Sequence, residues 1–232
     1  LIVPEVNGDT LTAKDRLIAN PNCSTAQMVL ILKPLYDKVG LERVVISTYQ
    51  SVSGAGKEAV LELENQTRRN LQGQSSNADV FPYHISFNVI PQIDAFTDNG
   101  YTKEEMKMIQ ETQKILNDDR IRLTATTVRV PVFVGHSEAI NIQTKKSISP
   151  NQARSLLKKS PGVQVLDDPK TAKYPTPREL AGEDDVYVGR IRTDISQDNG
   201  LELWCVGDNL RKGAALNAVQ IAEHLIQKGL TS

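Results

Sequence analysis

A single cysteine lies where the sequence predicts that a helix begins. Residues 20–25 (Asn-Pro-Asn-Cys-Ser-Thr) lead directly into the apolar stretch 28–32, and Asn22 is a typical N-cap residue. Cys23 would therefore lie in the first turn, where unpaired backbone N–H groups and the helix dipole favour negative charge. Because the thiolate is the reactive form of cysteine, this position indicates a nucleophile with a lowered pKa. The pattern also fits a small buried cysteine without a chemical role.

The composition excludes several classes of protein. The chain has 27 Lys and Arg against 28 Asp and Glu, with no basic block, so we expect no nucleic-acid partner. Its longest apolar run is about five residues, far short of the roughly 18 that span a membrane. Two cysteines do not make a disulfide framework, and no cluster of His, Cys and Asp has the spacing of metal ligands. We expect a cytoplasmic protein with reduced thiols and no metal.

The hydrophobic pattern predicts an α+β fold with a mixed sheet. Long apolar strands joined by hairpin-like turns such as residues 198–200 alternate with amphipathic helices. Residues 72–80 read as a polar loop and residues 85–93 as extended. The predicted strands cover 44–49, 186–193 and 201–206, with two more between 121 and 144 that meet at Gly135-His136. The predicted helices cover 24–38, 56–70, 102–117, about 150–162 and 210–228.

A glycine-rich turn after the strand at 44–49 allows two interpretations. Residues 54–59 fit the loose dinucleotide pattern G-x-G-x-x-A. A dinucleotide-binding unit would need a second parallel strand soon after the helix, but polar residues follow. We therefore favour a glycine loop that lets a ligand approach the backbone, with a plain tight turn as the alternative.

Seven segments in order along the chain together resemble the aspartate-β-semialdehyde dehydrogenase family, in its bacterial form. The resemblance implies a fold like the C-terminal domain of glyceraldehyde-3-phosphate dehydrogenase, assembled as a homodimer. The segments are 3–7, 20–25, 49–56, 87–94, 111–116, 129–138 and 208–215.

The resemblance also implies how the chain is organised. Family members open with an NADP-binding domain, whereas this sequence begins abruptly at Leu1, so we expect that an N-terminal portion is missing. Residues 1–208 would form the catalytic and dimerisation domain. Residues 209–232 would form a helix that packs on the nucleotide-binding domain. The chain alone would then be inactive, because most of the NADP site lies in that other domain.

The reaction that the resemblance implies is the reductive dephosphorylation of L-4-aspartyl phosphate to L-aspartate 4-semialdehyde by NADPH. It would proceed through a thioester on Cys23 and serve lysine, threonine and methionine biosynthesis. One alternative is N-acetyl-glutamyl-phosphate reductase, although that nucleophile typically lies in a Gly-Cys-Tyr-Pro-Thr run. Another is a dimerisation module without catalysis of its own.

The family match assigns catalytic roles to three residues: Cys23 as nucleophile, His136 as general acid/base, and Gln50, which orients the thioester. Without that match, His136 would be read as a structural histidine. Cys205, in an apolar strand, is predicted to be an inert core thiol.

Substrate and cofactor residues follow from the same match. Arg129 would clamp the substrate carboxylate, unless it is a strand arginine facing solvent. Since a straight strand would hold Arg129 and His136 roughly 23 Å apart, the chain must bend at Pro131 or Gly135. Glu111 and Lys114 would bind the substrate amino group and phosphate, although the charged stripe Glu104, Lys107, Glu111 and Lys114 also fits a solvated face. The predicted cofactor contacts are Ser53, Gly54 and Asn209.

Overall fold

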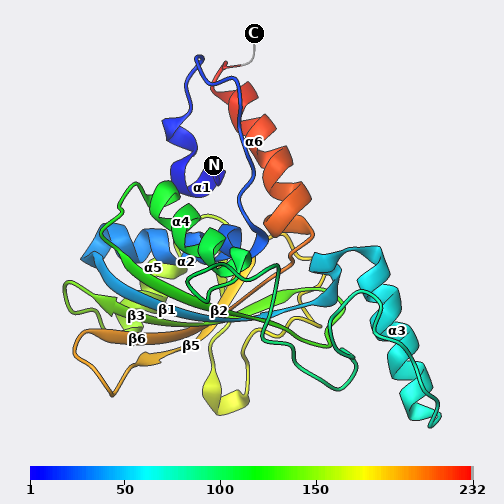
Figure 1. Ribbon diagram of the computed structural model, residues 1–232. Helices are drawn as coiled ribbons and strands as arrows, with labels where there is room; N and C mark the ends of the chain where they lie inside the picture. Colours follow the sequence, from blue (N-terminus) through cyan, green and yellow to red (C-terminus); the bar gives the residue numbers. More distant parts are fainter. Residues whose placement is uncertain (231–232) are drawn as a thin grey trace.

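A six-stranded mixed sheet organises the molecule. The computed structural model describes residues 1–230, and the strands lie in the order β2-β1-β3-β6-β5-β4 (Figure 1). The pairs β1–β2 and β4–β5 are parallel and the others are antiparallel. The predicted α+β fold with a mixed sheet is therefore confirmed. The strands are β1 (Leu41–Gln50), β2 (Arg122–Arg129), β3 (His136–Thr144), β4 (Val163–Val165), β5 (Val186–Thr193) and β6 (Gly200–Gly207).

Six α-helices accompany the sheet, and no helix among the described residues is long and apolar enough to cross a membrane. Short 3₁₀ turns occupy Gly8–Thr10, Val52–Ala55 and Pro169–Thr171, and a π-helical turn occupies Arg211–Ala215. The α-helices are α1 (Pro4–Asn7), α2 (Cys23–Val39), α3 (Lys57–Leu71), α4 (Lys103–Leu116), α5 (Pro150–Leu157) and α6 (Leu216–Gln227).

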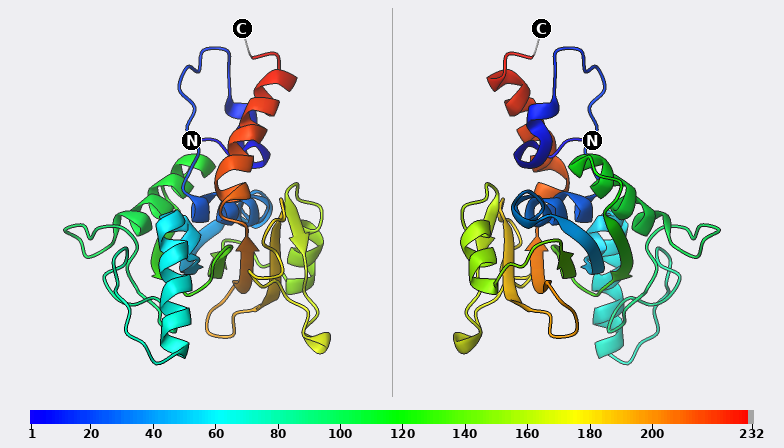
Figure 2. Two further views of the ribbon diagram at one scale, coloured as in Figure 1. Left: turned by 90° about the vertical axis from the view of Figure 1, so that its right-hand side faces the viewer. Right: turned by 90° about the vertical axis from the view of Figure 1, so that its left-hand side faces the viewer.

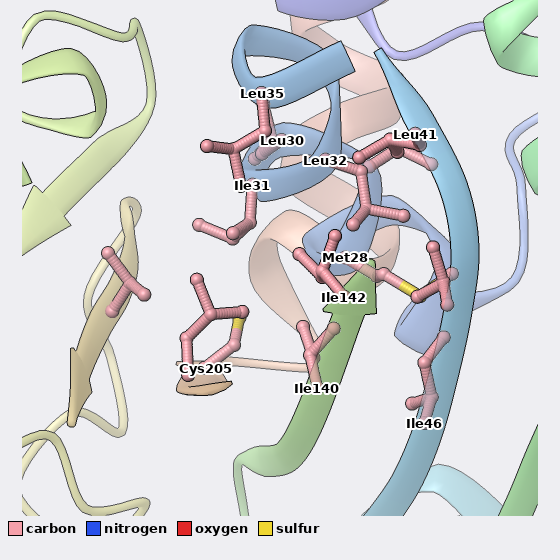
Figure 3. Packing of buried hydrophobic residues seen from close by; sticks show 14 of the residues in the cluster. Met28, Leu30, Ile31, Leu32, Leu35, Leu41, Ile46, Ile140, Ile142 and Cys205 are labelled. Carbon is pink, nitrogen blue, oxygen red and sulfur yellow. The ribbon is translucent and has the colours of Figure 1, made fainter. Parts of the chain in front are cut away.

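Helices α2, α4 and α5 cover one face of the sheet (Figure 1). Helix α2 lies at the centre of this layer, and its side chains are buried almost all round because it packs on the sheet, on α4 and on α5. Met28 and Ile31 point toward Ile140, Ile142 and the strands beside them (Figure 3). This apolar core fixes the position of α2, and with it the position of Cys23 at its first residue.

The opposite face of the sheet has no helix over its centre (Figure 2). Residues of β1 alternate, so that Val44, Ile46 and Thr48 are buried beneath α2 while Tyr49 points outward and is 40% exposed. Tyr49 packs against Trp204 of β6, with ring centroids 5.4 Å apart. An aromatic, partly exposed surface therefore lies on the outer face.

The bend in the connection between β2 and β3 explains how Arg129 and His136 can approach each other. The two predicted strands between 121 and 144 exist but do not pair with each other. Each instead pairs with β1, on opposite sides. Residues 130–135 cross over the end of β1, where Val52 N donates to Val132 O and Ser53 N donates to Phe133 O. Gly135 makes the final bend with φ +92°.

Most predicted elements are found within a few residues of their expected bounds, including the hairpin turn before Gly200. The extended segment predicted at residues 85–93 does not form a strand. Only Ile90 forms a β-bridge, to Arg129, because Ile85 and Ile90 pack against α3 instead of joining the sheet. Helix α1 and strand β4 were not predicted from the sequence.

The predicted C-terminal element begins as a π-helical turn and continues as α6, which packs against α1. Asn217 Nδ2 donates to Ile2 O and to Asn20 Oδ1, which holds α6 against the first residues of the chain. The end of the predicted 209–232 segment, residues 231–232, lies outside the described residues. Packing of this segment on a nucleotide-binding domain stays a prediction.

Candidate active site

Cys23 is the first residue of α2, as the sequence predicts. Asn22 caps the helix, since its Oδ1 accepts from Ser24 N at 3.0 Å and from Thr25 N at 3.2 Å. The same side chain donates through Nδ2 to Glu104 Oε1 at 2.7 Å, and Asn22 N donates to Glu111 Oε2 at 2.7 Å. Two carboxylates of α4 therefore hold the residue that precedes the cysteine.

The predicted lowering of the Cys23 pKa is wrong for this unliganded site. Burial raises the pKa of Cys23 to about 12, and the negative charge of Glu104 adds to that increase. The Ser24 N–H and the charge of Arg129 act in the opposite direction but are the smaller influences. The helix N-terminus is present, yet desolvation of the thiolate outweighs it.

Gln50, Arg129 and His136 meet at one end of the sheet. Gln50 and Arg129 are register partners at the ends of the parallel strands β1 and β2, while His136 begins the antiparallel strand β3 on the other side of β1. Gln50 Nε2 donates to Glu104 Oε1 at 3.2 Å, so the same carboxylate joins Gln50 to Asn22. This end of the sheet therefore faces the first turn of α2.

The hydrogen bonds of His136 define its tautomer. Its Nδ1 accepts from Ser51 N at 3.1 Å, so the neutral imidazole carries its proton on Nε2. Nε2 is buried and has no partner among the described residues, which leaves it available to a ligand. Burial, aided by the positive charge of Arg129, lowers the pKa of His136 to about 3. The ring is therefore a neutral donor at physiological pH.

Arg129 is buried, not solvent-facing. Its Nη1 donates to Ser51 O at 2.7 Å, its guanidinium lies 5.9 Å from the centre of the Phe81 ring, and its Nε has no partner among the described residues. Burial lowers the pKa of Arg129, but from so high a starting value that the group stays charged. A buried guanidinium with an unused donor is suited to binding a carboxylate.

Gly54 packs directly against this cluster. A Cβ added there would lie 2.9 Å from Arg129 Nη1 and 3.2 Å from His136 Nε2. The residue is exposed on its other side, and the absence of a side chain lets the backbone approach both groups closely. The turn at residues 54–59 therefore serves close approach to the backbone, and no second parallel strand follows α3 until β2.

Asn209 joins three loops instead of presenting a free amide. Its Oδ1 accepts from Gly135 N at 2.8 Å and from the hydroxyls of Ser51 and Ser53, and its Nδ2 donates to Ser53 Oγ at 3.0 Å. Ser53 and Gly54 thus lie beside His136 and Arg129, while their contact with a cofactor stays a prediction. Asn209 holds Ser53 in place, and both its Oδ1 and its Nδ2 already form hydrogen bonds within the protein.

The two charged pairs on α4 differ in where they point. Glu104 is 6% exposed and contacts Gln50 and Asn22, while Lys107 lies 3.8 Å from Glu104 Oε2. Glu111 Oε2 accepts from Asn22 N, directly before Cys23, and Lys114 is exposed. Helical spacing does not separate the two pairs, since Glu104, Met108, Glu111 and Ile115 share one face of α4. The roles predicted for Glu111 and Lys114 stay predictions.

Other predicted features agree with the structure or stay untested. Cys205 is fully buried and burial raises its pKa, as expected of a core thiol. Within residues 1–230, no group of three or more His, Cys, Asp or Glu side chains is arranged to hold a metal ion. Sequence reasoning missed Ser51, whose backbone contacts both His136 and Arg129.

Known proteins with this arrangement form one group. Residues 32–212 match the family model described as semialdehyde dehydrogenase, dimerisation domain. Aspartate-semialdehyde dehydrogenase of Aquifex aeolicus is 54% identical over 99% of this chain and 68% of that protein. The Legionella pneumophila enzyme is 55% identical over 97% of this chain and 66% of that protein. The chain thus spans about two thirds of the length of these curated relatives.

Solved structures give the same result. The crystal structure of aspartate semialdehyde dehydrogenase II of Vibrio cholerae complexed with ASA superposes with a TM-score of 0.94 at 51% identity, covering 97% of this chain and 67% of that one. The Candida albicans aspartate semialdehyde dehydrogenase with NADP superposes with a TM-score of 0.75 at 25% identity, covering 99% of this chain and 67% of that one. The similarity extends over nearly the whole described chain.

Proposed function

Because this chain belongs to the aspartate-semialdehyde dehydrogenase family, we propose that it carries the catalytic and dimerisation part of an enzyme that converts L-4-aspartyl phosphate to L-aspartate 4-semialdehyde. The observation that supports this most directly is the convergence of Gln50, Arg129 and His136 opposite the first turn of α2. A nucleophile, a carboxylate clamp and a buried neutral imidazole are the groups that acyl transfer from an acyl phosphate needs.

Three charged residues match the charges of the substrate. Arg129 binds the α-carboxylate through its free guanidinium N–H groups. Glu104 binds the α-ammonium, and Lys107, three residues later on α4, binds the phosphate. This assignment is an alternative to the one predicted for Glu111 and Lys114, since only Glu104 contacts Gln50.

Substrate binding also provides a way to activate Cys23. The carboxylate of Glu104 is the largest charge influence that raises the Cys23 pKa, so a substrate ammonium paired with it removes much of that effect. The Cys23 thiol passes its proton to the substrate phosphate, the thiolate attacks the acyl carbon to form a C–S bond, and the bond to phosphate breaks so that the protonated phosphate leaves. The Nε2–H of His136 donates to the acyl oxygen as negative charge develops on it, and Gln50 orients the resulting thioester.

The Ser53–Gly54 segment is the proposed contact for the reactive end of a nicotinamide. Gly54 is exposed beside His136 and has no side chain to exclude a planar ring, so the Ser53–Gly54 segment fits such a group. Reduction of the thioester to the aldehyde requires a hydride, which NADPH supplies when bound. Asn209 holds this segment in place and does not need to contact the cofactor itself.

Thioester formation can be tested without the cofactor. Protein incubated with aspartyl phosphate should release about one equivalent of phosphate and gain an aspartyl adduct on Cys23, detected by mass spectrometry. Cys23→Ser should form no thioester, whereas Cys205→Ser should behave like the wild type. An adduct on another residue, or none in the wild type, would contradict the proposal.

We also propose that the chain forms a homodimer through the outer face of the sheet. This face presents Tyr49 and Trp204 without a covering helix. Trp204→Glu should shift the mass measured by light scattering at micromolar concentration from dimer to monomer. Leu17→Glu is the control, because Leu17 is exposed and lies far from Trp204 in the sequence. A monomeric wild type would overturn the assignment.

A further inference from the structure

A row of buried polar side chains lies directly beneath the active site. Thr48, Glu138 and Cys205 are register partners on β1, β3 and β6, so their side chains share the face that α2 covers. Thr127 of β2 extends the row beyond Thr48. All four residues are essentially inaccessible to solvent.

This layer contains polar atoms that nothing in the described structure satisfies. Both carboxyl oxygens of Glu138 lack hydrogen-bond partners, as do the hydroxyls of Thr48 and Thr127. Gln27 of α2 lies over the layer, donates through Nε2 to His136 O at 3.3 Å and keeps an unpaired Oε1. Buried acceptors without donors are costly, and an ionised carboxylate among them would be the most costly.

Within residues 1–230, no cation lies close enough to compensate a charge at Glu138. The titratable groups that face it are Cys205 from β6, Cys23 from α2 and His136 on its own strand, and β1 contributes only the hydroxyl of Thr48. Cys23, Cys205 and His136 are uncharged at neutral pH, because burial raises the pKa of both thiols and lowers the pKa of the imidazole. An isolated carboxyl in such surroundings takes up a proton instead of ionising.

We propose that Glu138 is a positioning residue held as a neutral carboxylic acid, whose proton supplies the donor that the buried layer beneath Cys23 and His136 lacks. Its proton satisfies an orphan acceptor among its neighbours, such as Gln27 Oε1 or Thr48 Oγ1. In turn, Gln27 holds the His136 carbonyl, so the layer fixes the start of β3 against α2. Burial likewise raises the pKa of Glu138 and outweighs the Gln27 side chain, which acts in the opposite direction.

The neutral form also matters for the proposed nucleophile. A negative charge at Glu138 would raise the Cys23 pKa further. A neutral acid provides hydrogen bonding beneath the site without repelling the thiolate. This last step rests on the proposed function, whereas the protonation state of Glu138 does not.

Infrared spectroscopy tests the protonation state directly. Wild-type protein labelled with ¹³C-carboxyl glutamate should show the C=O band of a protonated carboxyl at pH 7, and Glu138→Gln should lose it. Because burial also raises the pKa of Glu111, the band must persist in Glu111→Gln. A wild type without such a band overturns the proposal, whatever the variants do.

Stability against pH gives an independent measurement. The unfolded carboxyl ionises near its ordinary pKa while the folded one stays protonated, so the folded state binds more protons and wild-type stability falls as pH rises above about 5. Relative to wild type, the folding equilibrium constant of Glu138→Gln should rise by about tenfold per pH unit until the folded carboxyl ionises. A difference independent of pH between 5 and 8 would contradict the proposal.

Glu62→Gln is the matched control, because Glu62 is also buried but both its oxygens have donors: Oε2 accepts from the N–H groups of Asp79 and Val80, and Oε1 accepts from Gln66 Nε2. The folding equilibrium constant of Glu62→Gln should not rise relative to wild type as the pH increases. Glu138→Gln should also leave the rate of Cys23 alkylation at pH 7 to 8 unchanged. A faster rate would mean that wild-type Glu138 is ionised, and would refute the neutral acid while leaving the proposed reaction intact.

Discussion

Gly213 lies directly against Cys23. A Cβ added at Gly213 would lie 2.8 Å from the Cys23 Cβ and 3.2 Å from its Cα, so the π-helical turn at Arg211–Ala215 packs on the first turn of α2 with no room for a side chain. Residues 190 positions apart in the sequence thus set the position of the proposed nucleophile together. Gly213 does not need a left-handed backbone here; it is required for close approach.

Gly213→Ala should therefore displace Cys23 and lower the rate of phosphate release from aspartyl phosphate by about 100-fold, since small displacements of a reacting group are costly. Rapid-mix phosphate assays measure the effect. Ala215→Ser, which adds one atom at an exposed position in the same turn, should keep the wild-type rate. Full activity in Gly213→Ala would show that the two elements can separate without consequence.

Gly54→Ala should weaken substrate binding more than folding. The new methyl group would meet the Arg129 guanidinium and the His136 ring, which are the proposed carboxylate clamp and hydrogen-bond donor. We expect at least about a tenfold loss in the second-order rate constant of phosphate release from aspartyl phosphate, corresponding to about 1.4 kcal/mol. The midpoint of thermal unfolding should change little, because the residue is exposed. Ala55→Ser, at the next exposed residue, is the control for added bulk, and an equal loss there would argue against a specific effect at Gly54.

Lys212 and Glu5 form an ion pair with unequal burial. Lys212 Nζ lies 2.6 Å from Glu5 Oε2; the lysine side chain is 1% exposed and the glutamate side chain 13%. Glu5→Ala leaves a buried ammonium without its anion and should cost about 3 kcal/mol of unfolding free energy. Lys212→Met leaves a carboxylate that water can reach and should cost less. Denaturant titration measures both, and the reverse order would contradict this explanation.

Asp9 and Lys228 provide the control for that comparison, because this pair joins the same two ends of the chain at the surface. Asp9→Asn should not change the denaturation midpoint measurably. A large decrease in the midpoint for Asp9→Asn would mean that any ion pair between the N-terminal segment and α6 stabilises the fold, and not the buried Lys212–Glu5 pair in particular.

The elements that could be predicted from sequence are those whose signal is local. The Asn22 cap and the apolar stretch 28–32 lie within a few residues of each other, and the helix that they predict is found as expected. The pairing of β2 and β3 with β1 could not be predicted in this way, because strand order depends on packing between distant segments.

The predictions for the site differ in the same way between local signals and contacts that depend on packing. The family motifs name residues that the structure brings near one another, since Gln50, Arg129 and His136 lie at the end of the sheet that faces Cys23; their roles stay predictions. The sign of the Cys23 pKa shift was wrong, because a helix start can be recognised in a sequence but burial of the thiol and its distance from Glu104 cannot. The contact of Glu104 with Gln50 was not predicted, since Glu104 and Glu111 share one face of α4 and fit the local pattern equally.

The pH dependence of Cys23 alkylation tests the role of Glu104. Because burial and the Glu104 charge raise the Cys23 pKa to about 12, the rate of iodoacetamide labelling in the unliganded protein should still be rising at pH 9, without a plateau near the ordinary value of ~8.5. Glu104→Gln removes the charge but keeps an oxygen that can accept from Asn22. Labelling at pH 8 should then rise by about threefold for each unit that the pKa falls, since the larger thiolate fraction is partly offset by lower nucleophilicity. Glu111→Gln, which changes the neighbouring carboxylate on the same helix face, should have a much smaller effect. A plateau below pH 9 in the wild type, or equal acceleration by both variants, would show that Glu104 does not control the thiol and that activation by the substrate ammonium is not needed.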